Sequence, residues 1–120
     1  MVEPSHLPLL EFASKATRDL RKLAKSNRES AEKIRAALDD LCGGAMNLDV
    51  KRIGGHPPWR RLRVGDWRVL YRELSSEEAT ELRRARGQRK KATSTGEVPG
   101  WLVFRIVNRK DLERAAGTLP

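Results

Sequence analysis

The stretch WRRLRVGDWRVLYREL (residues 59–74) decides the fold, because its two halves alternate on either side of Gly65-Asp66. An apolar/polar alternation with a period of two is typical of half-buried strands. Glycine at the first position of a two-residue loop favours a type II′ turn, since glycine adopts a positive φ without strain. We therefore predict an antiparallel hairpin with these opposed pairs: Val64 with Trp67, Leu62 with Val69, and Arg60 with Tyr71.

The alternation gives this hairpin two unlike faces. The apolar face, suited to packing under helices, consists of Leu62, Val64, Trp67, Val69 and Tyr71. The opposite face carries Arg61, Arg63 and Arg68, with Arg63 directly across from Arg68. Opposed like charges cost some tenths of a kcal/mol, and the planar guanidinium group makes paired hydrogen bonds to phosphate. A solvated outer face is the common alternative for a one-sided sheet, but arginine at three registered positions favours a phosphate-binding face.

The chain before the hairpin predicts one strand and two helices. The strand is LPLLEF (residues 7–12), and from Ser14 the apolar positions follow a helical period. A second amphipathic stripe ends at Gly43-Gly44, and SNRE (residues 26–29) fits the capping box that would start it. The segment 45–58, with paired glycines and paired prolines, is expected to be an irregular connection.

The chain after the hairpin predicts one more strand, WLVFRIV (residues 101–107). Strict alternation would direct Leu102, Phe104 and Ile106 toward the helices. It would place the other set on the arginine face, namely Val103, Arg105, Val107 and Arg109. The predicted order is β-α-α-β-β-β, a small α+β domain over residues 1–120 in which a helical hairpin covers one face of an antiparallel sheet. A charged tail of one or two helical turns follows.

Residues 75–100 are predicted to be a long basic loop, because they contain few large apolar residues and no sustained period. Loops of this length in compact domains tend to be functional or disordered. The segment lies between two strands of the basic face, so we expect nucleic-acid contacts from its cations, although a solvated loop is the alternative. These cations are Arg83, Arg84, Arg86, Arg89, Lys90 and Lys91.

The bulk composition favours a polyanionic partner, since the net charge is +9 and the isoelectric point is about 10.4. With Cys42 as the only cysteine, a disulfide framework and a zinc cluster are excluded, and no metal or other cofactor is expected. No apolar run approaches the roughly 20 residues that span a bilayer, and the N-terminus has no signal-peptide pattern. The chain is therefore expected to be cytoplasmic, without membrane contact.

The hairpin and the segment before it resemble the signature of the RelE/ParE superfamily of toxins from bacterial type II toxin–antitoxin modules. The likeness rests on KRIGG (residues 51–55) followed by WRRLRVGDWRVLY, and it extends to FASKATRDLRKL (residues 12–23). It covers residues 7–74 well, and then residues 101–109 after the long loop. The resemblance implies a compact toxin that an acidic, partly disordered antitoxin neutralises.

In the RelE branch of the superfamily, the activity that this resemblance implies is cleavage of mRNA in the ribosomal A site. The 2′-hydroxyl attacks the adjacent phosphate, and basic residues of the exposed sheet face stabilise the developing charge. Matched by position, Arg61 and Arg63 take the place of basic residues on the second strand of that branch. Arg68 falls on its active-site arginine and Arg109 on the arginine that closes the last strand. Other expected RNA contacts are Lys51, Arg52 and Arg105.

One departure weakens the enzymatic interpretation. The segment after Arg109 has no tyrosine or histidine, and arginine cannot readily act as a base because its pKa exceeds about 12. The remaining candidates for proton transfer are Asp111, Glu113 and His56. The alternatives are a ParE-type toxin that binds DNA gyrase without catalysis, and a degenerate member that only binds its antitoxin. Trp59 and Trp101 could lie beside the arginine face and stack on bases.

Overall fold

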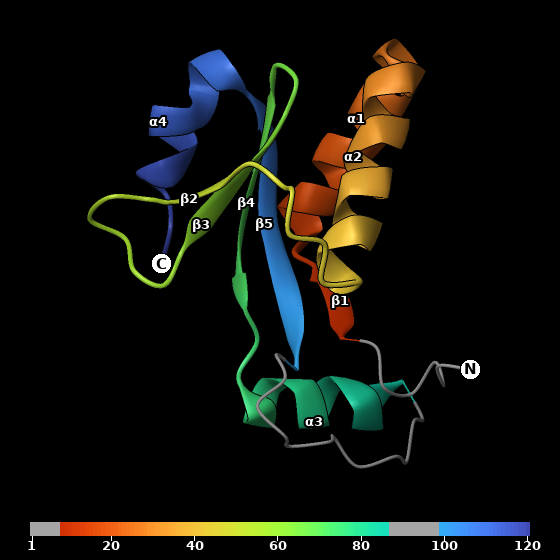
Figure 1. Ribbon diagram of the computed structural model, residues 1–120, viewed down its shortest axis with the longest axis vertical. Helices are drawn as coiled ribbons and strands as arrows, with labels where there is room; N and C mark the ends of the chain where they lie inside the picture. Colours follow the sequence, from red (N-terminus) through yellow and green to blue (C-terminus); the bar gives the residue numbers. More distant parts are fainter. Residues whose placement is uncertain (1–7, 87–98) are drawn as a thin grey trace.

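The computed structural model describes residues 8–86 and 99–120. Five strands form one mixed sheet in the order β1-β5-β4-β3-β2 (Figure 1). The elements in chain order are β1 (Leu9–Phe12), α1 (Ser14–Ser26), α2 (Arg28–Cys42), β2 (Val50–Arg52), β3 (Arg60–Val64), β4 (Trp67–Glu73), α3 (Ser76–Ala85), β5 (Gly100–Asn108), the 3₁₀ turn η2 (Arg109–Asp111) and α4 (Leu112–Ala116).

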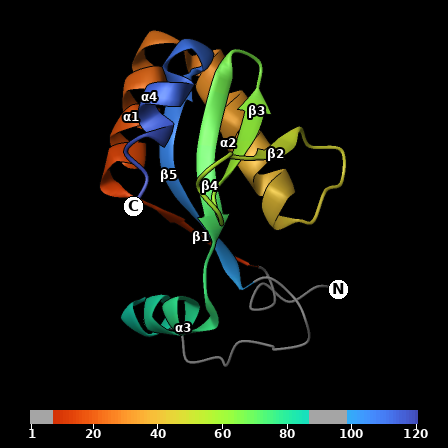
Figure 2. The same ribbon diagram turned by 90° about the vertical axis from the view of Figure 1, so that its left-hand side faces the viewer.

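The helices lie on different sides of this sheet. The antiparallel pair α1 and α2 covers one face, α4 lies on the opposite face, and α3 is placed beyond one end of the strands (Figures 1 and 2). The α+β class and the helical hairpin on one face are thus confirmed. The fold also contains two elements that the sequence pattern did not predict, β2 and α3.

The β3–β4 hairpin has the predicted register. Leu62 lies opposite Val69, and Arg63 lies opposite Arg68. Gly65 has a φ of +59°, whereas no non-glycine residue in the described part of the chain has a positive φ. Asp66 therefore does not take the second positive φ that a type I′ turn requires, so the turn agrees with type II′.

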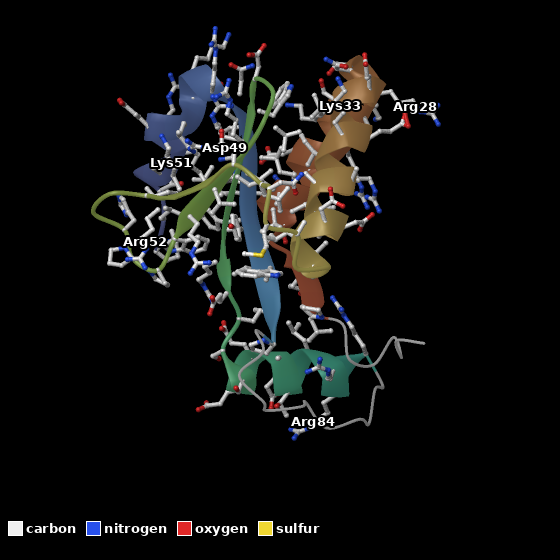
Figure 3. The ribbon with its side chains drawn as sticks, in the orientation of Figure 1. Arg28, Lys33, Asp49, Lys51, Arg52 and Arg84 are labelled. Carbon is white, nitrogen blue, oxygen red and sulfur yellow. The ribbon has the colours of Figure 1, made fainter. Side chains whose placement is uncertain are left out.

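The helix α2 starts one residue later than the capping box predicted. The residue Ser26 still belongs to α1, and its hydroxyl donates to the carbonyl oxygen of Lys22 at 3.2 Å. The N-cap is Asn27, whose Oδ1 accepts a hydrogen bond from the Ser30 amide at 3.2 Å. The outer side of α2 is charged, and Arg28 and Lys33 project from it (Figure 3).

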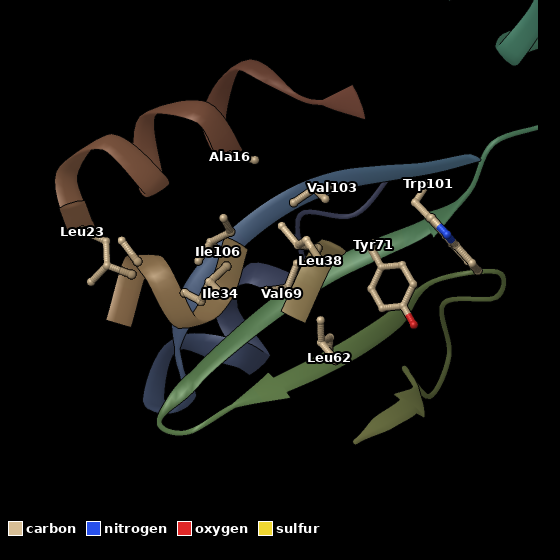
Figure 4. Close-up of a cluster of buried hydrophobic side chains, with 11 residues drawn as sticks. Ala16, Leu23, Ile34, Leu38, Leu62, Val69, Tyr71, Trp101, Val103 and Ile106 are labelled. Atoms are coloured by element: carbon tan, nitrogen blue, oxygen red, sulfur yellow. The ribbon is translucent and has the colours of Figure 1, made fainter. Parts of the chain in front are cut away.

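The main core lies between this helical hairpin and the sheet (Figure 4). Ile34 and Leu38 of α2 pack toward Leu62 and Val69, as the apolar face of the hairpin predicts. Tyr71 and Trp101 meet edge to face, with ring centroids 5.4 Å apart. Tyr71 is only 1% exposed, so the single tyrosine of the chain is a core residue and not a surface acid or base.

The sheet is not wholly antiparallel, because β1 runs parallel to β5 with Leu9 opposite Gly100. Alternation along a strand reports which side chains share a face, and it carries no information on strand direction. Gly100 is required at this contact: a Cβ atom there would lie 2.6 Å from the carbonyl oxygen of Leu9 and 2.8 Å from Cδ1 of Leu74.

The predicted division of β5 into two faces is wrong in its first half. Ile106 lies opposite Val69, but Tyr71 lies opposite Val103, so the register shifts by one residue at Phe104. A bulge of this kind changes the phase of the alternation. As a result Val103 is fully buried in the main core, whereas Phe104 packs against Trp59 with ring centroids 5.3 Å apart.

Two segments that were predicted to be irregular contain regular structure. The short edge strand β2 lies within residues 45–58, with Lys51 opposite Arg61. The first part of residues 75–100 forms α3, which begins with a complete capping box between Ser75 and Glu78. Its apolar side joins a small cluster at one end of the sheet, formed by Leu9, Leu74, Ala79, Leu82 and Leu102.

The face of the sheet opposite the main core is partly covered by α4. Ala115 packs with Leu70 of β4 and Val107 of β5, and all three are buried. The predicted tail of one or two helical turns is therefore confirmed, and it has a defined packing site. No helix in the described part of the chain is long and apolar enough to cross a membrane.

Candidate functional site

Four arginines come together on the sheet face that carries α4, near the turn that joins β3 to β4. We call Arg61, Arg63, Arg68 and Arg109 the arginine cluster. The first two lie on β3 and the third on β4, with Arg63 directly opposite Arg68. Arg109 begins η2 just after β5, and its amide donates to the carbonyl oxygen of Asp66 at 2.8 Å, which ties it to the hairpin turn.

The electrostatics of Arg68 report the closeness of the other three. Partial burial, followed by the positive charges of Arg63, Arg61 and Arg109, holds the pKa of the Arg68 guanidinium below its ordinary value. Nη1 of Arg68 donates to the carbonyl oxygens of Gly65 at 2.8 Å and Trp67 at 3.0 Å. The side chain is thus held against the turn, in the field of its neighbours.

Two carboxylates partly offset these charges. Asp49 precedes β2, and its Oδ1 accepts from Nη1 of Arg61 at 3.2 Å while its Oδ2 lies 3.7 Å from Nη1 of Arg63. Asp66 lies 3.8 Å from Nε of Arg109, with both side chains largely exposed. The pairs that involve Arg63 and Arg109 are open to water and contribute little. Two carboxylates also cannot match four guanidinium groups, so the cluster keeps an excess of positive charge that an anion can satisfy.

The members of the cluster differ in how firmly they are held. The Arg61 side chain is 14% exposed and also donates to the backbone oxygen of Asp49 at 3.3 Å. By contrast the side chains of Arg63 and Arg109 are 55% and 68% exposed. The side chains of Arg61 and Arg68 are therefore held in place by their hydrogen bonds, whereas the more exposed side chains of Arg63 and Arg109 can move toward a ligand.

Beside the cluster lies a pocket of about 390 Å³ between α4 and the loop that joins β2 to β3. Its wall includes the predicted RNA contacts Lys51 and Arg52 (labelled in Figure 3) together with Arg61. Two of the three proposed proton carriers, His56 and Glu113, also line it. The third, Asp111, lines a different hollow with Asp19 and Lys110.

Arg105 does not join the arginine cluster. Its Nε and Nη2 donate to the two carboxylate oxygens of Asp19 in α1, at 2.7 and 3.2 Å. The Asp19 carboxylate also accepts from the Ile106 amide at 2.9 Å. Alternation predicts the register of Arg105 correctly, because Arg105 lies opposite Leu70, but the contact with Asp19 holds its guanidinium group beside α1 and away from the cluster.

The described cations of α3, and Arg86 directly after it, are also separate from the cluster. Arg83 is buried, with 8% of its surface exposed. Arg84 pairs with Glu81 at 3.0 Å, and Arg86 pairs with Glu11 at 2.7 Å. The other predicted contacts of this segment, Arg89, Lys90 and Lys91, lie outside the described residues.

Neither tryptophan that was considered for base stacking presents an open ring. Trp101 is 7% exposed and belongs to the main core. Trp59 is 3% exposed, and the Arg72 guanidinium lies 5.5 Å from its ring centroid.

The sequence pattern identified the arginines of the site but not its acidic members, Asp49 and Asp66. Neither carboxylate has a periodic signal, because Asp49 comes just before an unpredicted strand and Asp66 was assigned only to a turn. The clue that was available is local: a single acid precedes the KRIGG segment (residues 51–55), two residues before its first cation.

The arrangement of the cluster suits binding of a phosphodiester and stabilisation of negative charge that develops on it. It does not suit proton transfer by the cluster itself, since an arginine keeps its proton.

Comparison with known proteins gives one family and several structures. A family model described as "ParE toxin of type II toxin-antitoxin system, parDE" matches residues 10–92, which is more than half of the chain. No curated protein matches this chain. The RelB–RelE antitoxin–toxin complex from Methanococcus jannaschii is 18% identical, with coverage of 87% of this chain and 95% of that chain and a TM-score of 0.51.

The E. coli DinJ–YafQ toxin–antitoxin complex is 15% identical, with coverage of 88% of this chain and 97% of that chain and a TM-score of 0.55. At these identities the likeness to solved structures establishes the fold alone.

Proposed function

We propose that this chain, which belongs to the family of ParE toxins of type II toxin–antitoxin systems, acts by cleaving mRNA on the ribosome. The observation that carries the proposal is the arginine cluster. Three guanidinium groups act on the pKa of Arg68, and among the described residues two carboxylates, Asp49 and Asp66, pair with the cluster. A protein with +9 net charge that concentrates arginine in this way is suited to hold a phosphodiester.

In the proposed reaction, the 2′-hydroxyl oxygen attacks the adjacent phosphorus and the bond to the 5′-oxygen of the next nucleotide breaks. The proton of the 2′-hydroxyl leaves to a base, and the 5′-oxygen takes up a proton. Negative charge grows on the non-bridging phosphate oxygens as the attack proceeds. Arg68, with Arg61 beside it, donates to these oxygens from positions that the turn and Asp49 already fix.

Ribosome-bound mRNA is the substrate with which to test this function. Purified toxin is added to ribosomes carrying a defined message, and the transcript ends are mapped. The proposal expects cleavage at a fixed position relative to the codon in the A site, and loss of cleavage when Arg68 is replaced by alanine. Intact message at growth-inhibiting toxin concentrations would contradict it.

The second candidate is a toxin that inhibits DNA gyrase without catalysis, and two observations favour it. The matching family is that of ParE, and the four guanidinium groups of the arginine cluster keep their protons, so they cannot act as the base. Supercoiling by purified gyrase in the presence of the toxin separates the candidates. Inhibition of supercoiling with no mRNA cleavage would replace the first function by the second.

We also propose an acidic antitoxin as the protein partner. The excess positive charge of the chain supports this partner, and the RelE and YafQ structures that resemble it are toxin–antitoxin complexes. A partly disordered acidic segment that folds on docking would neutralise exposed cations such as Arg63 and Arg109.

A further inference from the structure

The pocket between α4 and the β2–β3 loop adjoins the arginine cluster and shares Arg61 with it. We propose that this pocket, called here the α4 pocket, binds one unpaired nucleobase of single-stranded RNA, next to the phosphate that the cluster holds. The inference rests on the proposed phosphate site, and it adds a subsite that distinguishes among bases.

Both sides of the α4 pocket are held by contacts of their own. On one side the loop is closed by backbone hydrogen bonds, from the Ile53 amide to Trp59 at 3.0 Å and from the His56 amide to Ile53 at 3.1 Å. On the other side α4 is anchored by Ala115, which packs on Leu70 and Val107. The pocket therefore exists before a ligand arrives, and its volume of about 390 Å³ falls in the range of small-molecule sites.

The lining divides into an apolar part and a charged part. Ile53, Leu112 and Ala116 provide aliphatic surface, which suits the flat face of a base. The cations of the wall, Lys51, Arg52 and Arg61, suit the phosphates on either side of that base. A free phosphate would use only the charged part, so the apolar surface points to a ligand with a hydrophobic ring.

Arg61 belongs to both the pocket and the cluster, so the two sites are adjacent. Its side chain lines the α4 pocket, and its guanidinium group shares the Asp49 carboxylate with Arg63. One side chain thus belongs to both sites, which places the base within about one nucleotide of the bound phosphate.

Glu113 supplies the selectivity that the geometry implies. It lies on α4 at the pocket wall, and an ionised carboxylate only accepts hydrogen bonds. Adenine, guanine and cytosine each present an amino group on the pairing edge, whereas uracil presents one N–H between two carbonyl oxygens. We expect the α4 pocket to accept the three amino-bearing bases and to disfavour uracil.

Binding without cleavage is the first test, because it does not depend on the proposed reaction. Nitrogen-15-labelled toxin is titrated with inorganic phosphate and with the four nucleoside 3′-monophosphates. Phosphate should move the amide signals of Arg63 and Arg68 only. The adenine, guanine and cytosine nucleotides should also move those of Gly54, Ala116 and Gly117, with uridine 3′-monophosphate binding about tenfold more weakly, as expected for the loss of one hydrogen bond to a charged group. The same shifts for phosphate and for all four nucleotides would overturn the subsite.

Glu113→Gln is the matched variant, since it keeps the size of the side chain and removes its charge. It should abolish the difference between uridine and the other nucleotides while leaving phosphate binding intact. Glu32→Gln makes the same change on the exposed side of α2 and should alter nothing. Retained discrimination in Glu113→Gln would contradict the assignment.

Cleavage supplies a second readout, with messages that differ only in the nucleotide flanking the cleaved bond. Uridine there should slow cleavage by wild-type toxin; Glu113→Gln is assayed by nucleotide binding alone, because Glu113 is also a candidate for proton transfer in the cleavage reaction. If the wild type cleaves all four messages equally, the subsite fails and the proposed function stands. If nothing is cleaved but the nucleotide shifts appear as described, the proposed function fails and the base-binding pocket stands.

Discussion

The arginines of this toxin fall into two groups that differ in their surroundings. In the arginine cluster, burial and neighbouring cations lower the pKa of Arg68. At the other end of β4, two hydrogen bonds from Arg72 to the Glu78 carboxylate, at 2.9 and 2.8 Å, raise the pKa of Arg72. Asp19 raises the pKa of Arg105 in the same way.

The comparison separates structural from functional use of one residue type. Arg72 and Arg105 each have a carboxylate in two-point contact, so their charge is already matched within the protein. Asp49 is instead shared between Arg61 and Arg63. Charge that the protein leaves unmatched at a defined place is available for a ligand, whereas matched charge joins elements of the fold.

Replacing Arg68 with alanine tests the arginines of the cluster and should have the largest effect on cleavage. Loss of one positioned donor to a developing oxyanion typically slows a reaction by about 10²–10³-fold. Single-turnover cleavage of ribosome-bound mRNA measures this loss, and circular dichroism should show an intact fold. Arg28→Ala, which removes an exposed arginine paired with Glu32 on α2, is the control and should cleave normally. Equal activity of both variants would refute the distinction.

Replacing Asp19 with asparagine tests the arginines that are matched by a carboxylate within the protein. The change removes the charge that binds Arg105 and leaves a partly buried guanidinium without its partner, next to the Ile106 amide. We expect the free energy of unfolding to fall by about 2 kcal/mol, measured by urea denaturation. Glu29→Gln, which removes an exposed i,i+4 pair with Lys33, should change it by less than about 0.5 kcal/mol. A stability loss no larger than that control would show that the Asp19 pair contributes nothing.

The pair Arg72–Glu78 predicts a dependence of stability on pH. Hydrogen bonds from Arg72, and then from the Ser75 amide, lower the pKa of Glu78 from 4.5 to about 2. Because the folded-state pKa is depressed, this stabilisation is present above about pH 4.5 and is lost as the pH falls toward 2. The Glu78 side chain is 41% exposed, so solvent screening limits the contribution to about 1 kcal/mol.

The measurement is urea unfolding between pH 6 and 2.5, for wild-type toxin and Glu78→Gln. The stability difference between the two proteins should shrink as the pH falls through this window. A difference that stays constant would exclude Glu78 as the titrating group.

Replacing Asp49 with asparagine tests whether charge matching limits ligand binding by the cluster, and it should have the smallest effect of the substitutions considered. It removes the carboxylate that Arg61 and Arg63 share, so a phosphate no longer competes with it. Affinity for short single-stranded RNA should rise about threefold at low salt, as expected for an exposed ion pair. Fluorescence anisotropy measures this rise. Asp66→Asn, where the pair with Arg109 is 3.8 Å long, should produce a smaller gain. Weaker binding by Asp49→Asn would show that Asp49 mainly positions Arg61.

Much of the candidate site could be predicted from one hairpin. Alternation and the Gly65 turn determine which residues oppose each other, and these interactions are local, so Arg63 and Arg68 are correctly paired. The contacts of Arg105 could not be predicted in this way. Its register opposite Leu70 follows from alternation, but its guanidinium group is held by Asp19, which is 86 residues away in the chain.

The helix α3 had a local signal that the composition concealed. Ser75 and Glu78 form a capping box, but the basic residues that follow favoured a loop assignment. The parallel pairing of β1 with β5 had no comparable signal, since a strand shows its faces and not its direction.

The sequence by itself determined the hairpin, the helical pair and the arginine face, because each depends on residues a few positions apart. Only the tertiary structure decided which arginines are available to a ligand. That depends on carboxylates brought from other elements: Asp19 from α1, Glu78 from α3, and Asp49 from the start of β2. Charge matching is a property of distances in space, and periodicity along the chain does not record it.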